Sequence, residues 1–214
     1  MKRKFQHIAY LLMVAAVITS CGEKKQTSEF PDWAWADFQR PEGINPIVSP
    51  DTTTVFYCPM RQDSVAWESS DTFNPAATIY DGKVVVLYRA EDNSAVGIGS
   101  RTSRLGYAYS DDGLHFNRMT VPVFYPADDN QKELEWPGGC EDPRVAVKDD
   151  GLYVMLYTQW NRKQARLAVA TSRDLQIWEK YGPAFAKAYG GRFFDEFSKS
   201  ASIVTKLVDG KQVI

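Results

Sequence analysis

Two adjacent carboxylic acids, Glu141 and Asp142, stand between a glycine pair and a Pro-Arg pair in "WPGGCEDPRV" (136–145). A positioned carboxyl group can give a proton to a reacting oxygen, and a second carboxylate nearby raises its pKa. The pair is therefore a candidate for acid–base catalysis. The alternatives are structural: Asp142 caps a turn before Pro143, and Glu141 pairs with Arg144 or faces solvent, because adjacent residues of an extended segment point to opposite faces.

A polar residue before proline and a cation at a strand end are the next candidates. Asn74 precedes Pro75, where it either starts a turn or binds a ligand. Arg89 ends the apolar run "VVVLYR", and its charge either binds a ligand at the strand end or pairs with Glu91 or Asp92. The residues alone leave both alternatives open.

The histidine and cysteine content limits other kinds of chemistry. His7 and His115 are the only two histidines, and His7 lies in the leader described below, so a Ser-His-Asp triad would depend on His115 alone. His115 lies in the turn-like "DDGLHF" and receives no role. A His-rich metal site is excluded, and we expect no metal or organic cofactor. Cys58 and Cys140 either form a disulfide or are two buried thiols.

The first twenty residues have the pattern of an export signal. A basic start at residues 2–4 precedes twelve apolar residues at 8–19, too few to span a bilayer. Cys21 follows directly, which resembles a bacterial lipoprotein signal; the alternative is an ordinary signal peptide in which Cys21 has no role. We expect residues 1–20 to be removed, Cys21 to be lipidated, and the protein to be exported and anchored to a bacterial membrane.

The charge of the remaining chain argues against nucleic acid as a partner. Loss of residues 1–20 removes three basic residues and no acids, which leaves 22 Lys and Arg against 27 Asp and Glu, a net charge of −5. No basic cluster remains, whereas nucleic-acid binding requires one. Residues 21–35 are largely polar and predict a tether between the lipid and a folded domain at 36–214.

The domain has the pattern of an all-β protein. Short runs rich in Val, Tyr, Leu and Thr are separated by Asp-Gly turns, and no segment has an apolar period of 3.6 over a helical length. The runs lie at 83–90, 105–110, 152–160 and 166–172.

This strand pattern repeats along the chain. The aligned segments are 74–89 with 142–158 and 104–116 with 166–178, and a third copy begins in 200–214. Such repeats predict β-propeller blades, in which Asn74 and Asp142 occupy equivalent positions and face one pocket, with Arg89 close by. Closing a propeller takes at least about four blades, so we expect the N-terminal half of a longer protein, with about two and a half blades.

The joint occurrence of these motifs resembles glycoside hydrolase family 130. The motifs are "NPIVSP" (45–50), "FNPAATIYDGKVVVLYRAED" (73–92), "RLGYAYSDDGLHF" (104–116) and "GGCEDPRV" (138–145). The resemblance implies a five-bladed β-propeller enzyme that cleaves β-mannosides, in some members with inorganic phosphate as co-substrate and in others with water. It implies a mannose-containing oligosaccharide as the partner.

The same resemblance assigns roles to individual residues. It implies that Asp142 is the catalytic proton donor, and that Asn74 and Arg89 hold the sugar next to the cleaved bond. Three further substrate-binding candidates lie within the matching motifs: Asp92, Glu141 and Arg144.

Glycoside cleavage also needs attack on the anomeric carbon from the face opposite the acid. If phosphate is the attacking group, cations must hold it, and Arg162 and Lys199 are candidates. Flat aromatic rings can stack on sugars, or simply pack in the core. The candidates are Trp136 first, then Trp67 and Trp160.

Two other functional interpretations stay open besides the choice between phosphorolysis and hydrolysis. One is a carbohydrate-binding propeller without catalytic activity. The other is an inactive fragment of a longer enzyme.

Overall fold

The computed structural model describes residues 40–204, 207–208 and 211–212. The chain divides into two compact units, Met1–Arg40 and Pro41–Ile214, and every element below belongs to the second. The predicted leader, the tether and Cys21 lie outside the described residues. Within the described ranges, no helix is long and apolar enough to cross a membrane.

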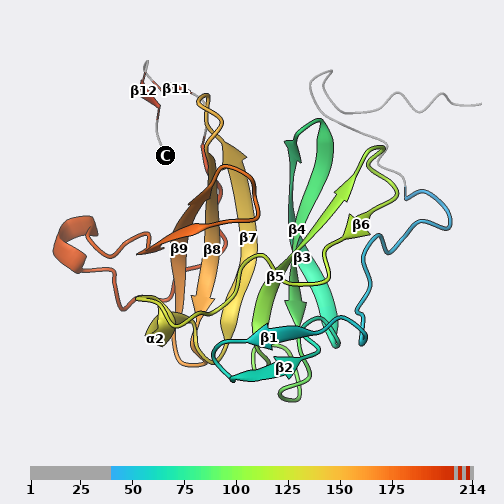
Figure 1. Cartoon of the computed structure of the whole chain (residues 1–214). Helices are drawn as coiled ribbons and strands as arrows, with labels where there is room; N and C mark the ends of the chain where they lie inside the picture. Colours follow the sequence, from blue (N-terminus) through green and yellow to red (C-terminus); the bar gives the residue numbers. More distant parts are fainter. Residues whose placement is uncertain (1–39, 205–206, 209–210, 213–214) are drawn as a thin grey trace, which may run out of the picture. The chain divides into compact units, whose positions relative to one another are not determined.

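The first repeat forms a four-stranded antiparallel meander (Figure 1). Its strands are β3 (Asp71–Tyr80), β4 (Lys83–Glu91), β5 (Ser103–Ser110) and β6 (Asn117–Arg118). Strand β4 is buried over nearly its whole length, which explains its unbroken apolar run. Asp81 and Gly82 connect β3 to β4 with φ angles of 49° and 72°, as a two-residue hairpin with two left-handed residues requires.

The second repeat forms an equivalent meander. Its strands are β7 (Gly139–Val147), β8 (Tyr153–Trp160), β9 (Ala165–Ser172) and β10 (Glu179–Pro183). The two meanders lie side by side (Figure 1), and one parallel pair, Ser103 with Gly139, links their sheets. They are two propeller blades with β3 and β7 as first strands, so the predicted repeat alignment is confirmed.

The remaining elements are short. They are the hairpin β1 (Phe56–Cys58) and β2 (Asp63–Val65), helix α2 (Lys132–Glu135), the 3-10 turn η1 (Ala188–Gly191), β11 (Leu207–Val208) and β12 (Lys211–Gln212). Strands β11 and β12 pair antiparallel where the third repeat was expected to begin, although its predicted turn at 209–210 lies outside the described residues. The described part of the chain is therefore almost entirely β, as predicted.

Two apolar clusters form the core of the described residues. One combines residues of both blades, among them Leu87, Leu105 and Met155. The other packs the β1–β2 hairpin against the first blade around Trp67, which is completely buried and donates its indole N–H to the Thr120 carbonyl. Trp67 is thus a core residue and not a ligand platform.

The two cysteines belong to different clusters and are free thiols. Cys58 lies in the cluster around the β1–β2 hairpin, and Cys140 lies in the cluster between the blades. Burial raises the pKa of the Cys140 thiol well above its usual value, which keeps it protonated and unreactive. Of the two alternatives for this pair, the structure has the buried thiols.

Candidate functional site

A β-bulge interrupts the first strand of each blade. The register between β3 and β4 shifts around Asn74, which has a φ of 45°, and the register between β7 and β8 shifts around Asp142, which has a φ of 51°. Asn and Asp adopt this left-handed conformation more readily than other residues with a Cβ. The equivalent bulges aim both side chains out of the regular ladder.

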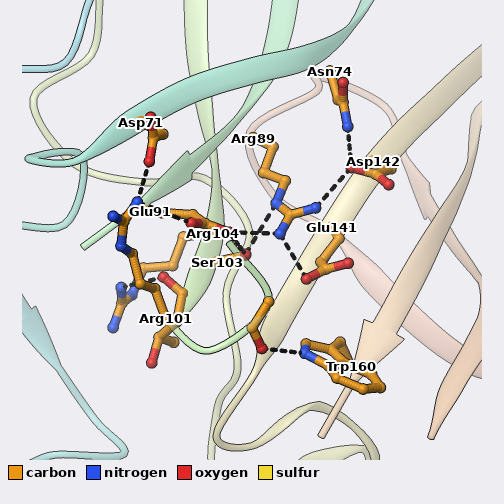
Figure 2. A network of polar contacts seen from close by, with 12 residues as sticks. Asp71, Asn74, Arg89, Glu91, Arg101, Ser103, Arg104, Glu141, Asp142 and Trp160 are labelled. Carbon is orange, nitrogen blue, oxygen red and sulfur yellow. Dashed lines mark hydrogen bonds and ion pairs between the residues drawn. The ribbon is translucent and has the colours of Figure 1, made fainter. Parts of the chain in front are cut away.

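Asn74 and Asp142 meet directly between the blades. The Asn74 Nδ2 donates a hydrogen bond of 2.8 Å to Oδ1 of Asp142, and Nη1 of Arg89 donates to the same oxygen at 3.1 Å (Figure 2). Lys199 Nζ lies 3.6 Å from the other carboxylate oxygen of Asp142. The structure therefore brings together four of the residues that the sequence singled out.

Arg89 is the centre of this cluster. Its side chain is almost completely buried, and its Nη2 donates to Glu91 at 2.5 Å and to Glu141 at 2.8 Å. Its Nε donates to the Ser103 hydroxyl at 3.1 Å, and its guanidinium lies 4.6 Å from the Phe73 ring centroid. A buried cation is costly unless it is paired and hydrogen-bonded, and three carboxylates meet that need here. We call Arg89, Glu91, Glu141 and Asp142 the Arg89 cluster.

The orientation of Glu141 differs from the expectation for an extended strand. Adjacent residues should point to opposite faces, but Glu141 and Asp142 both contact Arg89, because the positive φ of Asp142 breaks the alternation. The ion-pair partner of Glu141 is therefore Arg89 and not Arg144, and the side chain is buried and does not face solvent.

The two adjacent carboxyl groups differ in acidity. Burial raises the pKa of Glu141 to about 7; the Arg89 charge opposes this shift and the Asp142 carboxylate adds to it. Burial also raises the pKa of Asp142, but the Asn74 hydrogen bond and the Arg89 charge outweigh burial, so the pKa ends below its usual value. Without substrate, Asp142 is thus the ionised member of the pair near neutral pH, and Glu141 titrates there.

Asp92 does not belong to the Arg89 cluster. It accepts a 2.9 Å bond from Arg104 Nη1 and another from the Ser94 backbone N–H, and both side chains of the Asp92–Arg104 pair are buried. Arg104 also contacts the Cys58 sulfur. The predicted substrate-binding role of Asp92 lacks support from this placement, which is that of a structural ion pair.

Two of the other predicted residues, Arg144 and Arg162, form no hydrogen bond or ion pair with Asp142 among the described residues. Arg144 donates to the Pro143 carbonyl and lines a separate pocket between β3 and β7. Arg162 lies in the exposed β8–β9 connection, and no ion pair of this residue is found in the described part of the chain. Of the two phosphate-binding candidates, Lys199 is the one that the structure places at the carboxylates.

Ser103 is the contact of Arg89 that sequence reasoning missed. It lies opposite Glu91 in the β4–β5 pairing, and its hydroxyl donates to Glu91 at 3.2 Å. The motif "RLGYAYSDDGLHF" begins at the next residue and does not include this serine. It could be found only from the register between the two strands.

A pocket of about 260 Å³ opens beside the Arg89 cluster. It is lined by three charged side chains, Arg89, Glu141 and Lys199, and by apolar side chains that include Trp160. Figure 2 shows Trp160 on the Glu141 side of the cluster, away from Asn74. Trp136, the first choice among the tryptophans, packs against the β1–β2 cluster. Trp160 is the tryptophan that lines this pocket, and the choice between Trp136 and Trp160 as a sugar-stacking residue stays a prediction.

The described residues contain no group of three or more His, Cys, Asp or Glu side chains arranged to hold a metal ion. The carboxylates that do converge surround the Arg89 guanidinium. What this arrangement offers is one ionised carboxylate, one carboxyl that titrates near neutrality, and hydrogen-bond donors beside both. Such groups suit proton transfer to and from a hydroxyl-rich ligand.

Comparisons with known proteins agree with the motifs. Residues 39–214 match the model of glycoside hydrolase family 130, described as β-1,4-mannooligosaccharide phosphorylase. A 1,2-β-oligomannan phosphorylase from Thermoanaerobacter sp. (strain X514) is 37% identical over 152 residues, which cover 69% of this chain and 46% of that protein.

Solved structures extend the similarity to the fold. The crystal structure of a candidate glycosidase from Bacteroides thetaiotaomicron VPI-5482 is 99% identical, with a TM-score of 0.82 over 87% of this chain and 54% of that one. A structure from work on family 130 hydrolases that target β-1,2-mannosidic linkages in Candida mannan is 69% identical, with a TM-score of 0.81 over 86% and 52% of the two chains.

These neighbours are five-bladed propellers, so the predicted fold class is confirmed. The chain spans about half the length of the relatives it matches. Over that half, the family model, the strand repeats and the bulged Asn-Pro and Asp-Pro motifs agree. The chain belongs to glycoside hydrolase family 130.

Proposed function

We propose that the full-length protein cleaves β-mannosides at the Arg89 cluster. The observation that carries this proposal is the convergence of Asn74, Arg89 and Lys199 on the two oxygens of Asp142. These groups can hold hydroxyls of a sugar beside a carboxyl group, as acid-catalysed glycoside cleavage requires. The family's phosphorylases and hydrolases of β-mannosides support a mannosyl unit in this position.

Asp142 is the proposed proton donor, which requires its pKa to rise when substrate binds. The Asn74 hydrogen bond is the largest contribution that lowers this pKa. A sugar hydroxyl that takes over the Asn74 amide, and a ring that excludes water, would both favour the protonated form. Substrate binding would thus prepare the acid.

Glu141 is a second candidate for the proton donor, because its pKa of about 7 keeps it partly protonated at neutral pH without substrate. Comparison of Asp142→Asn with Glu141→Gln on an unactivated β-mannoside distinguishes the two. If Asp142 is the acid, its variant loses about a thousandfold or more of kcat, within the range for general acids, and the Glu141 variant loses less. The reverse order would assign the role to Glu141.

We propose hydrolysis and not phosphorolysis for this protein. The Arg89 cluster contains three carboxyl groups, and the two cations at it, Arg89 and Lys199, already pair with them, whereas a phosphate dianion needs cations that are not already neutralised. The 69% identical neighbour comes from work on β-1,2-mannoside hydrolases, which supports the same choice and that linkage.

The test is incubation of the full-length protein with β-1,2-mannobiose in the presence and absence of inorganic phosphate. Hydrolysis predicts free mannose at a rate that phosphate does not change. A product that appears only with phosphate and carries it would overturn hydrolysis. Binding of mannobiose without turnover under either condition would instead support the non-catalytic propeller.

We also propose that the protein is exported and anchored through a lipid on Cys21, with residues 1–20 removed. The basic start, the twelve apolar residues and the cysteine after small residues support this. Metabolic labelling with a radioactive fatty acid should label the wild-type protein in the membrane fraction. A Cys21→Ser variant should be unlabelled; equal labelling of both proteins would refute the proposal.

A further inference from the structure

We propose that a pocket at the edge strand of the second blade, separate from the Arg89 cluster, binds a neutral sugar ring. The pocket has a volume of about 380 Å³ and lies between the connection from the first blade to the second and the turn between β9 and β10. We call it the rim pocket; it is lined by residues within 123–130 and 176–180. Its volume lies in the range of small-molecule sites. The proposal goes beyond the proposed function, because binding there requires no catalysis.

The rim pocket is not an extension of the site around Asp142. Strand β9 begins at Ala165, which lines the pocket beside Glu141, and ends at Ser172, directly before the turn that carries Gln176. Seven steps of about 3.3 Å per residue place the two ends of β9 roughly 23 Å apart. The two pockets have no lining residue in common. A sugar ring at this turn would therefore be a second ligand of the protein.

Side-chain hydrogen bonds fix the turn between β9 and β10. Oδ1 of Asp174 accepts the backbone N–H of Gln176 at 2.9 Å and that of Ile177 at 2.8 Å. Oγ of Ser172 accepts the backbone N–H of Leu175 at 2.8 Å. Bonds of this kind hold a turn in one conformation. The turn therefore presents its side chains to the pocket before any ligand binds.

Two half-buried aromatic rings of fixed orientation line the rim pocket. The indole N–H of Trp178 donates to the Leu175 carbonyl at 3.0 Å, and its ring packs edge-to-face on Phe124 with centroids 6.0 Å apart. Tyr125 packs on Phe56 with centroids 4.8 Å apart. Aromatic surface suits the C–H face of a pyranose ring, and a side chain that is already ordered loses little entropy when a ligand binds.

The charge of Lys180 in this pocket is already neutralised. Its Nζ donates to the buried Glu135 at 2.5 Å and to the Tyr125 carbonyl at 2.9 Å, and it lies 3.1 Å from the Asp129 carboxylate. An ammonium group has three donors, so these acceptors occupy all of them. A phosphate or another anion would find no free cation here, because binding it requires one. The pocket therefore favours a neutral ligand.

Exposed polar groups at the mouth of the pocket suit the hydroxyls of such a ligand. Asn130 and Gln176 are exposed, and no hydrogen bond of the Gln176 side-chain amide is found within residues 40–204. An amide offers both donors and an acceptor, as hydroxyl groups require. Ile177, which is 78% exposed, adds apolar surface beside them. Aromatic rings with neutral polar groups around them indicate a sugar and not an anion or a purely apolar ligand.

The first blade contains the same turn and supplies a matched control. Oδ1 of Asp112 accepts the backbone N–H groups of Leu114 and His115, each at 2.8 Å, as Asp174 does in the second blade. The repeat alignment pairs these two residues with Gln176 and Ile177. Neither Leu114 nor His115 lines the rim pocket. Their replacement changes an equivalent turn and leaves the proposed site intact.

The experiment uses fluorine NMR of the full-length protein with 5-fluorotryptophan in place of tryptophan. Trp178→Phe identifies the Trp178 resonance by its loss. The probes are mannose and β-1,2-mannobiose, whose choice rests on the proposed function, and inorganic phosphate as the anion. All titrations use an Asp142→Asn background, in which turnover is slow.

We expect both sugars to shift the Trp178 resonance saturably and phosphate to leave it unchanged. Gln176→Ala combined with Ile177→Ala should weaken this sugar binding about tenfold, through the loss of a hydrogen bond and of apolar contact. Leu114→Ala combined with His115→Ala should not weaken it. With Asp142 restored, both double variants should keep wild-type kcat and KM for β-1,2-mannobiose.

Three results would overturn the rim pocket as a sugar site: no saturable shift with either sugar, equal sugar binding by the two double variants, or a shift with phosphate alone. A rise in KM for β-1,2-mannobiose that is confined to the Gln176 and Ile177 variant would make the pocket part of the active site, which also contradicts the proposal. If the wild-type protein cleaves no mannoside, the proposed function fails by itself, and the Trp178 titration still decides whether the rim pocket binds sugar.

Discussion

The side-chain amide of Asn74 donates a 2.8 Å hydrogen bond to Asp142, although 68 residues separate them in the chain. The two residues occupy the same bulge in successive blades, and both have left-handed backbone conformations. Duplicating one strand motif has thus produced a donor and an acceptor that face each other. The contact also lowers the pKa of Asp142, so one repeat controls the acidity of the other.

Two variants of Asn74 distinguish the contribution of its side-chain hydrogen bond from that of its left-handed backbone conformation. Asn74→Gly removes the hydrogen bond and keeps a residue that tolerates a positive φ, whereas Asn74→Ala removes the bond and strains the backbone by about 1–2 kcal/mol. We expect both variants to lower kcat/KM for β-1,2-mannobiose at least tenfold, and the alanine variant to be the less stable by about 1 kcal/mol. Urea unfolding measures this difference; equal stabilities would mean that the φ of 45° is not under strain.

Asp92 should affect stability and leave catalysis unchanged. Replacement of Asp92 by Asn leaves the Arg104 charge buried without its partner, and such a loss costs about 3–5 kcal/mol. We expect Asp92→Asn to unfold at a clearly lower urea concentration, and its folded fraction to keep wild-type kcat and KM. Asp142→Asn should show the opposite pattern: a large loss of kcat and only a small change in the urea concentration at which it unfolds. A large rise in KM for the Asp92 variant would restore the substrate-binding role implied by its motif.

Local sequence patterns were sufficient to predict the blades. The Asp-Gly pairs predicted hairpins because few other residues adopt two successive left-handed conformations, and the structure has one at Asp81 and Gly82. The alignment of "NPA" with "DPR" predicted that Asn74 and Asp142 occupy equivalent positions, since both precede proline at the start of a repeat. These patterns depend only on residues that are neighbours in the sequence, so they can be recognised without knowing how the chain packs.

Features that depend on a single backbone angle or on strand register were beyond the sequence. The direction of Glu141 follows from the φ of Asp142, and the contact of Ser103 with Arg89 follows from the β4–β5 register. Trp160 could not be distinguished from Trp136, because both lie next to irregular segments and only packing shows which one borders the pocket. Tertiary contacts decided these three cases.

Replacement of Gly139 should destabilise the protein through a steric clash, and not only through the positive φ that it shares with turn glycines. Its φ is 116°, and a Cβ at this position would lie 2.2 Å from the Ser103 carbonyl oxygen, at the parallel β-pair of Ser103 with Gly139 that joins the sheets of the two described blades. Gly82 also has a positive φ, but a Cβ there would meet nothing within 4 Å. We expect Gly139→Ala to be the less stable of the two alanine variants by about 2 kcal/mol, in the range of overpacking. Equal urea midpoints for Gly139→Ala and Gly82→Ala would show that the backbone around Ser103 accommodates the added methyl group without loss of stability.

The titration of Glu141 should make stability depend on pH near neutrality. The folded state raises its pKa to about 7 from a usual value of 4.5, so between these values the folded protein binds more protons than the unfolded chain. The free energy of unfolding must then fall as the pH rises through this window. Asp142 has the opposite sign, because its pKa is lowered: its contribution to stability is present above its usual pKa and is lost only in more acidic solution.

Urea unfolding at several pH values measures the effect of Glu141. Between pH 5 and pH 7.5, we expect the free energy of unfolding to fall by about 2 kcal/mol more for the wild-type protein than for Glu141→Gln, from about 1.4 kcal/mol for each unit of pKa. Glu133→Gln, which removes an exposed carboxyl group, should behave as the wild type does. Parallel pH profiles for all three proteins would show that Glu141 does not titrate in this range.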